Sequence, residues 1–484
     1  MERAKGGASI RLYFVTVHVR TIGPTEERTM KTRVRFRSTI SLAALLSLCA
    51  LQSCADGPAT TQPLTAVSAR AAAGGVSVTA TNPPFGQPGE TQKQVVITGS
   101  GFVQGSVASW QRNGVDDPKI RVSATQFNSA TQVTATINIA ADAALAFYSV
   151  AVTNPDRKGG IGTELFEVTQ ATLIAGTEIA YGGNDNGDVT GRVGVPGVFS
   201  FNSSVGLDTL GSPGRGFDIS VDGLAIVGGT TINVSSDQGY VYVKTGGVWL
   251  RTNLPKDPSG TMVRPLGVAS DPGTGAATLI GGWESLGSSG NSLNRRPRLW
   301  TYGIGSWSRV VLPNASTDDL VFDVASSGVA IGMANNRAAS WDPTGPGTWA
   351  LTVFGAAGSK GRGVNSAGTL AVGEVSLSGG KTAAVYWTRT GAVWNAPLTL
   401  PGSCTSAEAV DDVGRIVANG CPNGSHPSPA IIAAPYAAIN ITYLGGLGDA
   451  KNQAVVENIS LQGTTIVGQA TLKSVAYGVM WRIF

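Results

Sequence analysis

The amino-acid sequence predicts an all-β protein in which a β-sandwich precedes a seven-bladed β-propeller. Two observations support this prediction. A unit rich in Gly and β-branched residues recurs seven times over residues 181–484, and a different, non-repeating run of short strands occupies residues 76–170. From Gly191 to Gly468 there are 277 residues over six intervals, a mean of about 46. Periods of about 40–50 residues in a strand-rich chain are typical of radially arranged, four-stranded blades.

Each copy of the unit contains a turn that ends in Gly, then two mostly apolar residues and a small residue. A tight hairpin favours Gly because positive φ costs little for a residue without Cβ. The small residue leaves room for a neighbouring backbone. The turn glycines are Gly187, Gly223, Gly275, Gly328, Gly368, Gly414 and Gly463. The residues that follow are Val189-Thr190-Gly191, Ile226-Val227-Gly228, Leu279-Ile280-Gly281, Ala330-Ile331-Gly332, Ala371-Val372-Gly373, Ile416-Val417-Ala418 and Ile466-Val467-Gly468.

A third strand in each copy ends on a bulky residue, and several copies open a fourth strand with Trp. The bulky residues are Phe199, Tyr242, Trp300, Trp341, Trp387, Ile432 and Trp481. The fourth-strand residues are Trp249, Trp307, Trp349 and Trp394. Aromatic residues that recur at one register favour packing between twisted sheets over sugar stacking, because aromatic side chains carry much of the burial in a core.

The last copy ends before a fourth strand, since only three residues follow Trp481. A ring of sheets must close or leave an open strand edge. We therefore predict that residues 171–175, just before the first copy, pair with the strand around Tyr477–Trp481 and close the ring. Six or eight blades stay open as alternatives, because insertions blur the period.

Four segments carry a resemblance to a known repeat. They are YGGNDNGDVTG at Tyr181–Gly191, GVNSAGTLAVG at Gly363–Gly373, AVYW at Ala384–Trp387 and LGGLG at Leu444–Gly448. The repeats resemble the extracellular HAF-type, kelch-like family, whose consensus is A-x-x-I-N-x-x-G-x-x-V-G followed by A-F-x-W. The resemblance covers about 300 residues loosely, and it implies an extracellular propeller domain, predicted over residues 171–484, but no particular reaction.

Residues 1–53 are predicted to be a leader whose functional start is Met30. Basic residues follow Met30, and the apolar segment Ile40–Leu51 is too short for a stable membrane span. It ends in Leu51-Gln52-Ser53-Cys54, which is similar to a bacterial lipobox. That resemblance implies that Cys54 is lipidated and becomes the mature N-terminus, whereas the alternative is an ordinary secretory signal with a chance Cys. Residues 54–75, rich in Ala, Thr, Pro and Gly, are predicted to be a flexible tether.

The positive net charge of the chain comes from this leader. The whole chain has 35 Lys and Arg and 31 Asp and Glu, a net charge of +4. Residues 1–53 hold nine of the basic and three of the acidic residues, so the remainder has 26 basic and 28 acidic residues, a net charge of −2. The remainder also has no basic run after Arg37. The sequence therefore predicts no nucleic-acid partner.

The segment 76–170 has the features of a small sandwich domain. Short, β-branched, alternating strands over about 90 residues are typical of that architecture. Four further features are Asn82-Pro83 near the start, ITGSGF at Ile97–Phe102, Gly105-Ser106-Val107, and VTNPD at Val152–Asp156. With them the segment resembles an IPT/TIG domain, which implies an immunoglobulin-like fold serving as a spacer or binding module in bacterial surface proteins.

Two cysteines follow Cys54, and their spacing predicts a disulfide. Cys404 and Cys421 are equidistant from the centre of the turn Asp411–Gly414. Residues at equal distances from a hairpin turn face each other across the two strands, and a disulfide there agrees with an oxidising compartment. Two free thiols or a metal pair are the alternatives. His426 is the one nearby histidine, which is too few ligands for a zinc site, so no metal site and no cofactor are predicted.

No residue is predicted to be catalytic. His426, the only histidine after the leader, lies in a loop and is more typical of an exposed residue than of a Ser-His-Asp triad. Glycosidase chemistry needs two acids, for which Asp318-Asp319, Asp411-Asp412 and Glu408 are candidates. Adjacent acids in a strand point to opposite faces, however, and Asp is common in turns. Asn184–Asp188 has the composition of a calcium loop without EF-hand spacing, so we interpret it as a hairpin turn.

The insertion Glu284–Arg298 is the least regular part of the repeat region. Arg295, Arg296 and Arg298 make it locally basic. Loops on a rigid scaffold commonly carry binding sites. These three arginines are therefore the predicted ligand-contact region, and a solvated insertion without a ligand is the alternative.

The sequence thus predicts a lipid-anchored protein outside the cytoplasm, at the outer membrane or surface of a bacterial cell. Its predicted role is non-catalytic binding of a glycan or protein, or structural display. The alternative is a secreted carbohydrate-active enzyme, a lyase or a glycosidase that uses acids and tyrosines. Two or more carboxylates that converge beside aromatic residues at the centre of the propeller would favour the enzyme. Only Gly, Ala and Ser there would argue against it.

Overall fold

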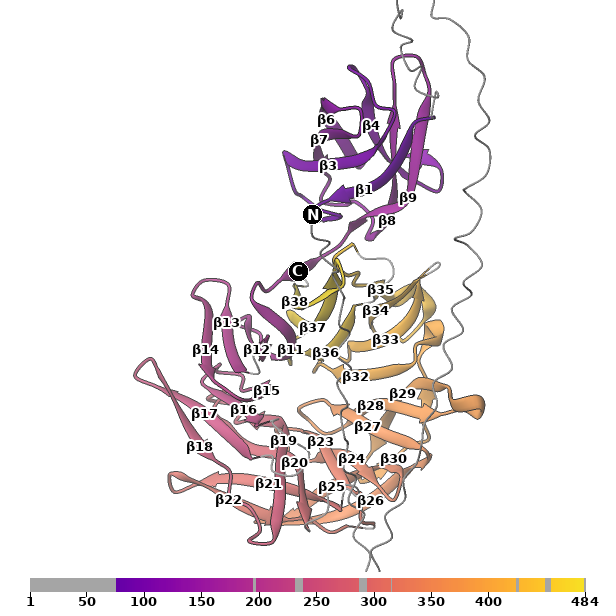
Figure 1. Ribbon diagram of the computed structural model, residues 1–484. Helices are drawn as coiled ribbons and strands as arrows, with labels where there is room; N and C mark the ends of the chain where they lie inside the picture. Colours follow the sequence, from indigo (N-terminus) through magenta and orange to yellow (C-terminus); the bar gives the residue numbers. More distant parts are fainter. Residues whose placement is uncertain are drawn as a thin grey trace, which may run out of the picture. The chain divides into compact units, whose positions relative to one another are not determined.

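The computed structural model describes residues 75–194, 197–230, 238–286, 294–314, 316–423, 426–448 and 454–482 (Figure 1). Within these ranges the regular structure is β, apart from three short 3₁₀ helices: η1 (Ser378–Gly380), η2 (Pro401–Ser403) and η3 (Ala438–Asn440). The all-β prediction is confirmed. None of the helices in the described ranges has the length and apolar character that a membrane span requires.

The described chain begins with two sheets that share one core. The first contains, in spatial order, β1 (Ser77–Asn82), β3 (Lys93–Ser100), β7 (Gln132–Ile139) and β6 (Ile120–Ser129). The second contains β2 (Phe85–Gly86), β9 (Gly159–Val168), β8 (Ala146–Thr153), β4 (Val107–Arg112) and β5 (Val115–Asp116). Alternate residues of both sheets point inward, and Trp110 packs edge-on against Phe166 with ring centroids 5.6 Å apart. The two sheets therefore pack face to face.

From Ala171 onward the described chain forms seven antiparallel sheets, and in all but the last the four main strands pair in chain order. The first sheet is β11 (Thr177–Gly183), β12 (Asp188–Val193), β13 (Gly197–Asn202) and β14 (Gly206–Gly211). The second is β15 (Arg215–Ile219), β16 (Ala225–Gly229), β17 (Gly239–Thr245) and β18 (Val248–Asn253). The third is β19 (Gly260–Ser270), β20 (Ala277–Leu286), β21 (Arg295–Gly303) and β22 (Ser306–Val311).

The remaining four sheets follow the same order. The fourth is β23 (Leu320–Val324), β24 (Ala330–Ala334), β25 (Arg337–Gly345) and β26 (Thr348–Ala357). The fifth is β27 (Ser359–Val364), β28 (Leu370–Ser376), β29 (Thr382–Thr390) and β30 (Val393–Trp394), with β31 (Leu398–Thr399) also on β29. The sixth is β32 (Ser406–Val410), β33 (Ile416–Asn423), β34 (His426–Ile432) and β35 (Ile441–Tyr443). The seventh is β36 (Val455–Ile459), β37 (Thr465–Leu472), β38 (Val475–Arg482) and β10 (Ala171–Leu173).

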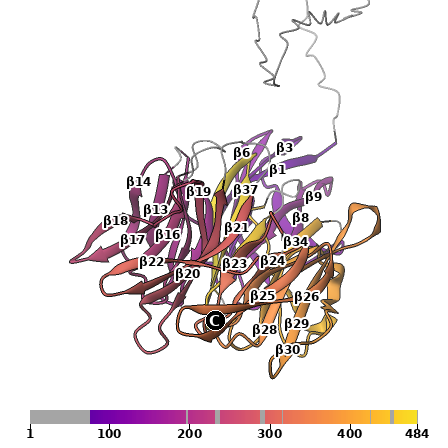
Figure 2. The same cartoon turned by 90° about the horizontal axis from the view of Figure 1, so that it is seen from below.

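The first strands of the seven sheets form a closed circle. Each of β11, β15, β19, β23, β27, β32 and β36 lies against the next, and β36 lies against β11. In Figures 1 and 2 the sheet β15–β18 and the sheet β27–β30 lie on opposite sides of this circle. The inner edges of seven sheets therefore surround one axis.

The last sheet closes the circle as the sequence predicted. Strand β10 pairs antiparallel with β38, with Ala171 opposite Trp481, Thr172 opposite Met480 and Leu173 opposite Val479. The pairing of residues 171–175 with the C-terminal strand is confirmed over residues 171–173. One sheet thus combines a strand from before the first repeat with three strands from the end of the chain, which covers an edge that would otherwise be open.

The turn glycines are confirmed at all seven positions. Gly187, Gly223, Gly275, Gly328, Gly368, Gly414 and Gly463 have φ between 69° and 88°. The small residue behaves as predicted in most copies, since a Cβ on Gly332 would lie 2.0 Å from the carbonyl oxygen of Leu320 on the neighbouring strand. In the third copy, however, the equivalent residue is Gly282 and not Gly281. A Cβ on Gly282 would lie 2.1 Å from the Arg264 carbonyl oxygen, and an extra residue in this turn shifts the register by one.

The recurrent aromatic residues fill the interior of the sheets. Phe199, Tyr242, Trp300, Trp341, Trp387 and Trp481 are all buried. Trp394 is buried as well, and Trp249, Trp307 and Trp349 are partly buried against neighbouring clusters. The interpretation as core residues is therefore confirmed for the buried set, which leaves no exposed ring face for a sugar at those positions.

The predicted disulfide is present in the sixth sheet. Cys404 and Cys421 are bonded, with a separation of 17 residues along the chain. Cys404 precedes β32 and Cys421 lies on β33, so the bond joins the two sides of the hairpin. Both side chains belong to a buried cluster with Ala407 and Ala418. The disulfide therefore adds a covalent link in a part of the core where the neighbouring apolar side chains, Ala407 and Ala418, are small.

Candidate active site

The seven first strands share an irregularity at one position. At this position the pairing of β11, β15, β19, β23, β27, β32 and β36 with the second strand of the sheet skips one residue, and β11 and β19 have further irregularities elsewhere. A residue skipped in this way forms a bulge, which leaves the ladder and redirects its side chain. The skipped residues are Tyr181, Phe217, Leu266, Phe322, Arg362, Glu408 and Glu457. We call this set the bulge ring.

All seven residues of the bulge ring line one cavity on the axis, with a volume of about 260 Å³. Their chemistry divides the ring into two arcs. The second to fourth sheets supply an apolar arc of Phe217, Leu266 and Phe322. The fifth, sixth, seventh and first sheets supply a polar arc of Arg362, Glu408, Glu457 and Tyr181. We call this cavity the funnel; it has an apolar wall that faces ionisable groups.

The residues that follow the bulge ring form the floor of the funnel. Asp218 accepts hydrogen bonds from the backbone N–H groups of Ile219 and Val268, both at 2.9 Å. Asp323 similarly accepts from the N–H groups of Val324 at 2.8 Å and Val364 at 2.9 Å. Each carboxyl group thus ties its own sheet to the next one, which is a structural role.

Asn458 completes the floor from the seventh sheet. Its side-chain oxygen accepts from the N–H of Ile459 at 2.7 Å, and its Nδ2 donates to Asp218 at 3.2 Å. The bond from Asn458 to Asp218 joins the seventh sheet to the second. The first sheet lies between them and contributes only Gly182, which has no side chain, to the floor. A Cβ on Gly182 would lie 2.6 Å from the Cα of Asp218, so the strands approach too closely for a larger residue.

Burial disturbs the titration of both floor carboxyl groups. It raises the pKa of Asp218 to about 8, and the negative charge of Asp323 adds to the effect while the Val268 N–H opposes it. Burial likewise raises the pKa of Asp323 to about 6 against two backbone hydrogen bonds. Burial therefore favours the neutral form of both carboxyl groups, and more strongly for Asp218 than for Asp323.

Arg362 is the fixed cation of the polar arc. Its guanidinium donates to Glu408 at 3.0 Å and to Glu374 on β28 at 3.1 Å, and Lys360 donates to Glu374 at 2.7 Å. Burial would lower the pKa of Arg362, but the charges of Glu408 and Glu374 outweigh it and raise that pKa. Burial would raise the pKa of Glu374, but Lys360 and Arg362 hold it below its usual value. Two cations and two anions thus form a neutral, ordered group.

Glu408 is held as an acceptor by several donors. Besides Arg362, the hydroxyl group of Ser406 donates to it at 2.5 Å and Asn419 donates at 3.2 Å. Charge-assisted hydrogen bonds such as the one from the guanidinium are the stronger ones. Glu408 is therefore held in one orientation at the funnel.

Glu457 lies in the next sheet and has a different environment. Within the described ranges its carboxyl group makes no hydrogen bond or ion pair. Burial raises the pKa of Glu457 to about 7; the charge of Glu408 also raises it, and Arg362 opposes both. Two neighbouring carboxyl groups in such different environments are the arrangement by which proteins separate a proton donor from an anion.

Aromatic side chains complete the wall beside these acids. The rings of Tyr181 and Phe217 are tilted against each other with centroids 5.8 Å apart. Arg215 donates to the Tyr181 hydroxyl group at 3.3 Å, and its guanidinium lies 5.9 Å from the Phe217 ring. Arg362 lies 5.8 Å from the Phe322 ring. The apolar arc therefore presents ring surface directly next to the charged groups.

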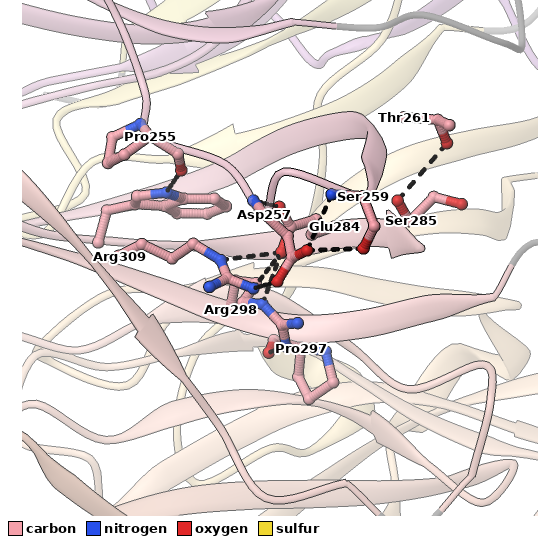
Figure 3. A network of polar contacts seen from close by, with 10 residues as sticks. Pro255, Asp257, Ser259, Thr261, Glu284, Ser285, Pro297, Arg298 and Arg309 are labelled. Atoms are coloured by element: carbon pink, nitrogen blue, oxygen red, sulfur yellow. Dashed lines mark hydrogen bonds and ion pairs between the residues drawn. The ribbon is translucent and has the colours of Figure 1, made fainter. Parts of the chain in front are cut away.

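The three arginines predicted as a ligand-contact region are bound within the chain. Arg295 pairs with Asp318, and the Arg296 guanidinium donates to the Ser316 carbonyl oxygen at 2.6 Å. Arg298 is 3% exposed and donates to buried Glu284 at 2.8 Å, in the network drawn in Figure 3. Residues 287–293 of the insertion lie outside the described ranges. Ligand contact by this region stays a prediction, and the side-chain contacts of its arginines do not support it.

Of the candidate carboxylates, only Glu408 lies in the funnel. Asp319 is buried and accepts from the Ser316 and Asn335 N–H groups, both at 2.9 Å. Asp411 is paired with Arg415 in its own hairpin, and Asp412 accepts from Ser366 of the fifth sheet. Three further acids line the funnel that the sequence did not single out: Asp218, Asp323 and Glu457.

The remaining candidates lie away from the funnel's polar arc. Asn184–Asp188 forms the β11–β12 turn, closed by the bond from the Gly187 N–H to the Asn184 carbonyl oxygen at 3.0 Å. Asn184 also accepts from the Asp188 N–H at 2.9 Å, so the turn uses its own polar groups. His426 begins β34, and its side chain lies outside the described part of the chain. No group of three His, Cys, Asp or Glu residues in the described ranges is arranged to hold a metal ion.

A signal for the missed residues was nevertheless present in the sequence. Six of the seven bulge-ring residues precede the turn Gly of their copy by six positions, as Glu457 precedes Gly463. The exception is Leu266, which precedes Gly275 by nine because that turn is longer. Counting back six positions from the turn glycines therefore reaches six of the seven residues, although it does not show that they form a bulge.

No protein-family model and no curated protein matches this chain. Solved structures of similar fold are β-propeller proteins. Virginiamycin B lyase from Staphylococcus aureus is 14% identical, with 65% of this chain and 98% of that chain covered and a TM-score of 0.38. A gluconolactonase from Xanthomonas campestris is 8% identical, with 75% and 98% covered and a TM-score of 0.34. TolB from Acinetobacter baumannii is 10% identical, with 78% and 80% covered and a TM-score of 0.34. This likeness concerns the fold alone.

The prediction of a non-catalytic binding or structural role is wrong. The funnel meets the condition stated above for an enzyme, because Asp218, Glu408 and Glu457 converge beside the rings of Phe217 and Phe322. The alternative, an enzyme on the propeller, fits this arrangement better.

Proposed function

We propose that the chain is a carbohydrate-active enzyme that hydrolyses glycosidic bonds in the funnel. The observation that carries this proposal is the pair of carboxyl groups on neighbouring sheets, Glu408 in an ion pair with Arg362 and Glu457 with its pKa raised to about 7. Glycoside hydrolysis requires one carboxyl group that donates a proton and a second that is negatively charged. The apolar arc faces this pair and offers ring surface to the C–H face of a sugar.

The two carboxyl groups have distinct roles in this proposal. Protonated Glu457 donates its proton to the glycosidic oxygen while the bond from that oxygen to the anomeric carbon breaks. Glu408 stabilises the positive charge that develops on the sugar, and it takes a proton from the water whose oxygen bonds to the anomeric carbon. Both protons then exchange with solvent, which restores the starting state. Arg362 positions Glu408 through their 3.0 Å hydrogen bond.

A lyase is the second candidate, and one observation favours it. The Tyr181 hydroxyl group accepts a hydrogen bond from Arg215 at 3.3 Å, which places a cation beside a phenol at the edge of the apolar arc. A phenol polarised in this way suits proton abstraction next to a carboxylate-bearing sugar carbon. An unsaturated product, detected by its ultraviolet absorbance, would distinguish elimination from hydrolysis.

The expected result is measurable with a panel of nitrophenyl glycosides. The purified mature chain should release nitrophenol from at least one of the α- and β-linked glucose, galactose, mannose, xylose and N-acetylglucosamine derivatives. Asp318→Asn, which changes a carboxyl group paired with Arg295 away from the funnel, is the matched control and should retain full activity. Absence of turnover across this panel, together with absence of any unsaturated product from uronate-containing polysaccharides, would contradict the proposal.

For the whole protein we propose a lipid anchor at Cys54, a flexible tether over residues 54–75, an immunoglobulin-like IPT/TIG sandwich and a seven-bladed propeller. The two face-packed sheets before residue 170 and the seven sheets around one axis support the last two parts. The lipobox-like sequence that ends in Cys54 supports the anchor and a place outside the cytoplasm, at the bacterial cell envelope.

The anchor leads to a direct prediction. Mass spectrometry of the membrane fraction should find Cys54 as the N-terminal residue with two or three acyl chains. Cys54→Ser should move the protein from that fraction into the soluble one. An N-terminus elsewhere without lipid would contradict the anchor and leave the funnel chemistry unaffected.

A further inference from the structure

We infer that the funnel takes a single terminal sugar residue, so that the enzyme acts from the end of a glycan chain rather than within it. This inference rests on the proposed glycosidase function and adds the mode of attack. Three features of the described structure lead to it: the size of the cavity, its closed floor and its complete wall.

The cavity is small for a glycan site. Pockets that enclose drug-sized ligands have volumes of about 300–1,000 Å³. The funnel has about 260 Å³, which suits one sugar ring and not several. A site that binds consecutive residues of a chain needs an elongated cleft instead, with both of its ends open.

The floor prevents a chain from passing through the axis. The bond from Asn458 to Asp218, 3.2 Å long, crosses the space above Gly182. A Cβ on Gly267 would lie 2.8 Å from the Oδ1 atom of Asp323, so the third and fourth sheets are equally close at this level. A second cavity of about 60 Å³ lies on the other side of the same side chains. Asp218, Asp323 and Asn458 therefore separate two cavities.

The wall surrounds the bound residue on all sides. Each of the seven sheets contributes one side chain of the bulge ring, and the first strands make a closed circle, so no side of the funnel opens between sheets. A sugar ring in the funnel can stack its C–H face on Phe217 or Phe322 while its polar edge meets Glu457. The rest of the glycan must then leave through the mouth, the one direction opposite the floor.

The experiment uses the mature chain and five pentasaccharides with reduced ends: those of β-1,4-glucose, β-1,3-glucose, α-1,4-glucose, β-1,4-xylose and β-1,4-N-acetylglucosamine. Products are separated by length during the first tenth of the reaction. We expect a monosaccharide and a reduced tetrasaccharide as the only early products. Early disaccharide and reduced trisaccharide would overturn the inference and leave the hydrolase function standing.

A binding experiment keeps the inference testable where turnover is slow. Saturation-transfer NMR with Glu457→Gln and the same five pentasaccharides should transfer magnetisation at least fivefold more strongly to the terminal non-reducing residue than to the third residue. Even transfer along the chain, or no binding of any pentasaccharide, would overturn the inference. Phe217→Ala should weaken binding of the terminal residue at least tenfold, and the matched control Asp318→Asn should leave it unchanged.

Discussion

Glu457→Gln is expected to reduce glycoside hydrolysis by a factor of about 10² to 10⁴, the range that one proton-transferring side chain usually contributes. Gln has nearly the same shape as Glu, but its amide does not donate a proton to the glycosidic oxygen. Substrate binding should stay within a factor of about three, because Glu457 has no partner within the described ranges that the change would leave unpaired. The measurement is kcat and KM on the nitrophenyl glycoside that the unmodified chain hydrolyses fastest.

The pH profile gives this prediction a second readout. Glu457 works as an acid only in its protonated form, and its pKa is raised to about 7 by burial. Activity should therefore fall as the pH rises through about 7, which is well above the usual range of a Glu side chain. Glu457→Gln should remove this alkaline limb from whatever activity remains. A profile unchanged in shape would show that another group donates the proton.

Glu408→Gln provides a matched comparison within the same ring. Its carboxylate accepts from Arg362, Ser406 and Asn419, so the change leaves a guanidinium with one acceptor fewer. We expect a loss of kcat comparable to that of Glu457→Gln, with the alkaline limb retained but moved to lower pH, because the charge of Glu408 no longer raises the pKa of Glu457. Equal pH profiles in the two variants would contradict the assignment of separate roles to the two carboxyl groups.

The repeat and its closure could be predicted from the sequence because they depend on local chemistry that recurs. A hairpin turn needs a residue that tolerates positive φ, so Gly187 and Gly463 identify the same turn in copies far apart. The strand at residues 171–173 could be placed because the last copy was short by one strand. Each of these inferences uses a pattern that every copy repeats.

The active-site residues could not be predicted in the same way. Strand alternation assigns side chains to faces only where pairing is regular, and a bulge interrupts that alternation at Phe322, Arg362 and Glu457. The chemistry also differs from copy to copy, since the bulge position holds Phe, Leu, Tyr, Arg or Glu. Asp318-Asp319 and Asp411-Asp412 are adjacent in the chain, whereas Glu408 and Glu457 are far apart in it and are brought together by neighbouring sheets.

At the predicted arginine site, the sequence did not indicate that a charged side chain is buried. Arg298 stands in a Ser- and Gly-rich insertion and reads as an exposed charge, yet it is buried beside Glu284 on the neighbouring strand β20. A charge is not removed from water unless it is paired, and the pairing partner lay 14 residues away. Nothing in the local sequence marks that pair, because burial is decided by packing between elements.

This buried pair leads to the largest stability effect that we expect. Glu284 is fully buried, and Arg298 and Arg309 donate to it at 2.8 and 2.9 Å (Figure 3). Arg309 also donates to Asp257 at 2.9 Å, which joins the segment after β18 to the third sheet. Glu284→Gln leaves two guanidinium groups with one anion, and breaking one side of a buried ion pair costs about 3–5 kcal/mol.

The measurement is the free energy of unfolding in urea, compared between Glu284→Gln and a control variant that changes an exposed ion pair. Asp142→Asn removes a carboxylate that pairs with Lys119 on the surface, and the midpoint should not move because water and salt screen exposed pairs. A loss below about 1 kcal/mol for Glu284→Gln would mean that the network relaxes around the change. The double variant Glu284→Gln and Arg298→Met should recover part of the lost stability, because an apolar side chain in that site requires no counter-charge. Such recovery would show that the unpaired cation, and not lost packing, causes the destabilisation of Glu284→Gln.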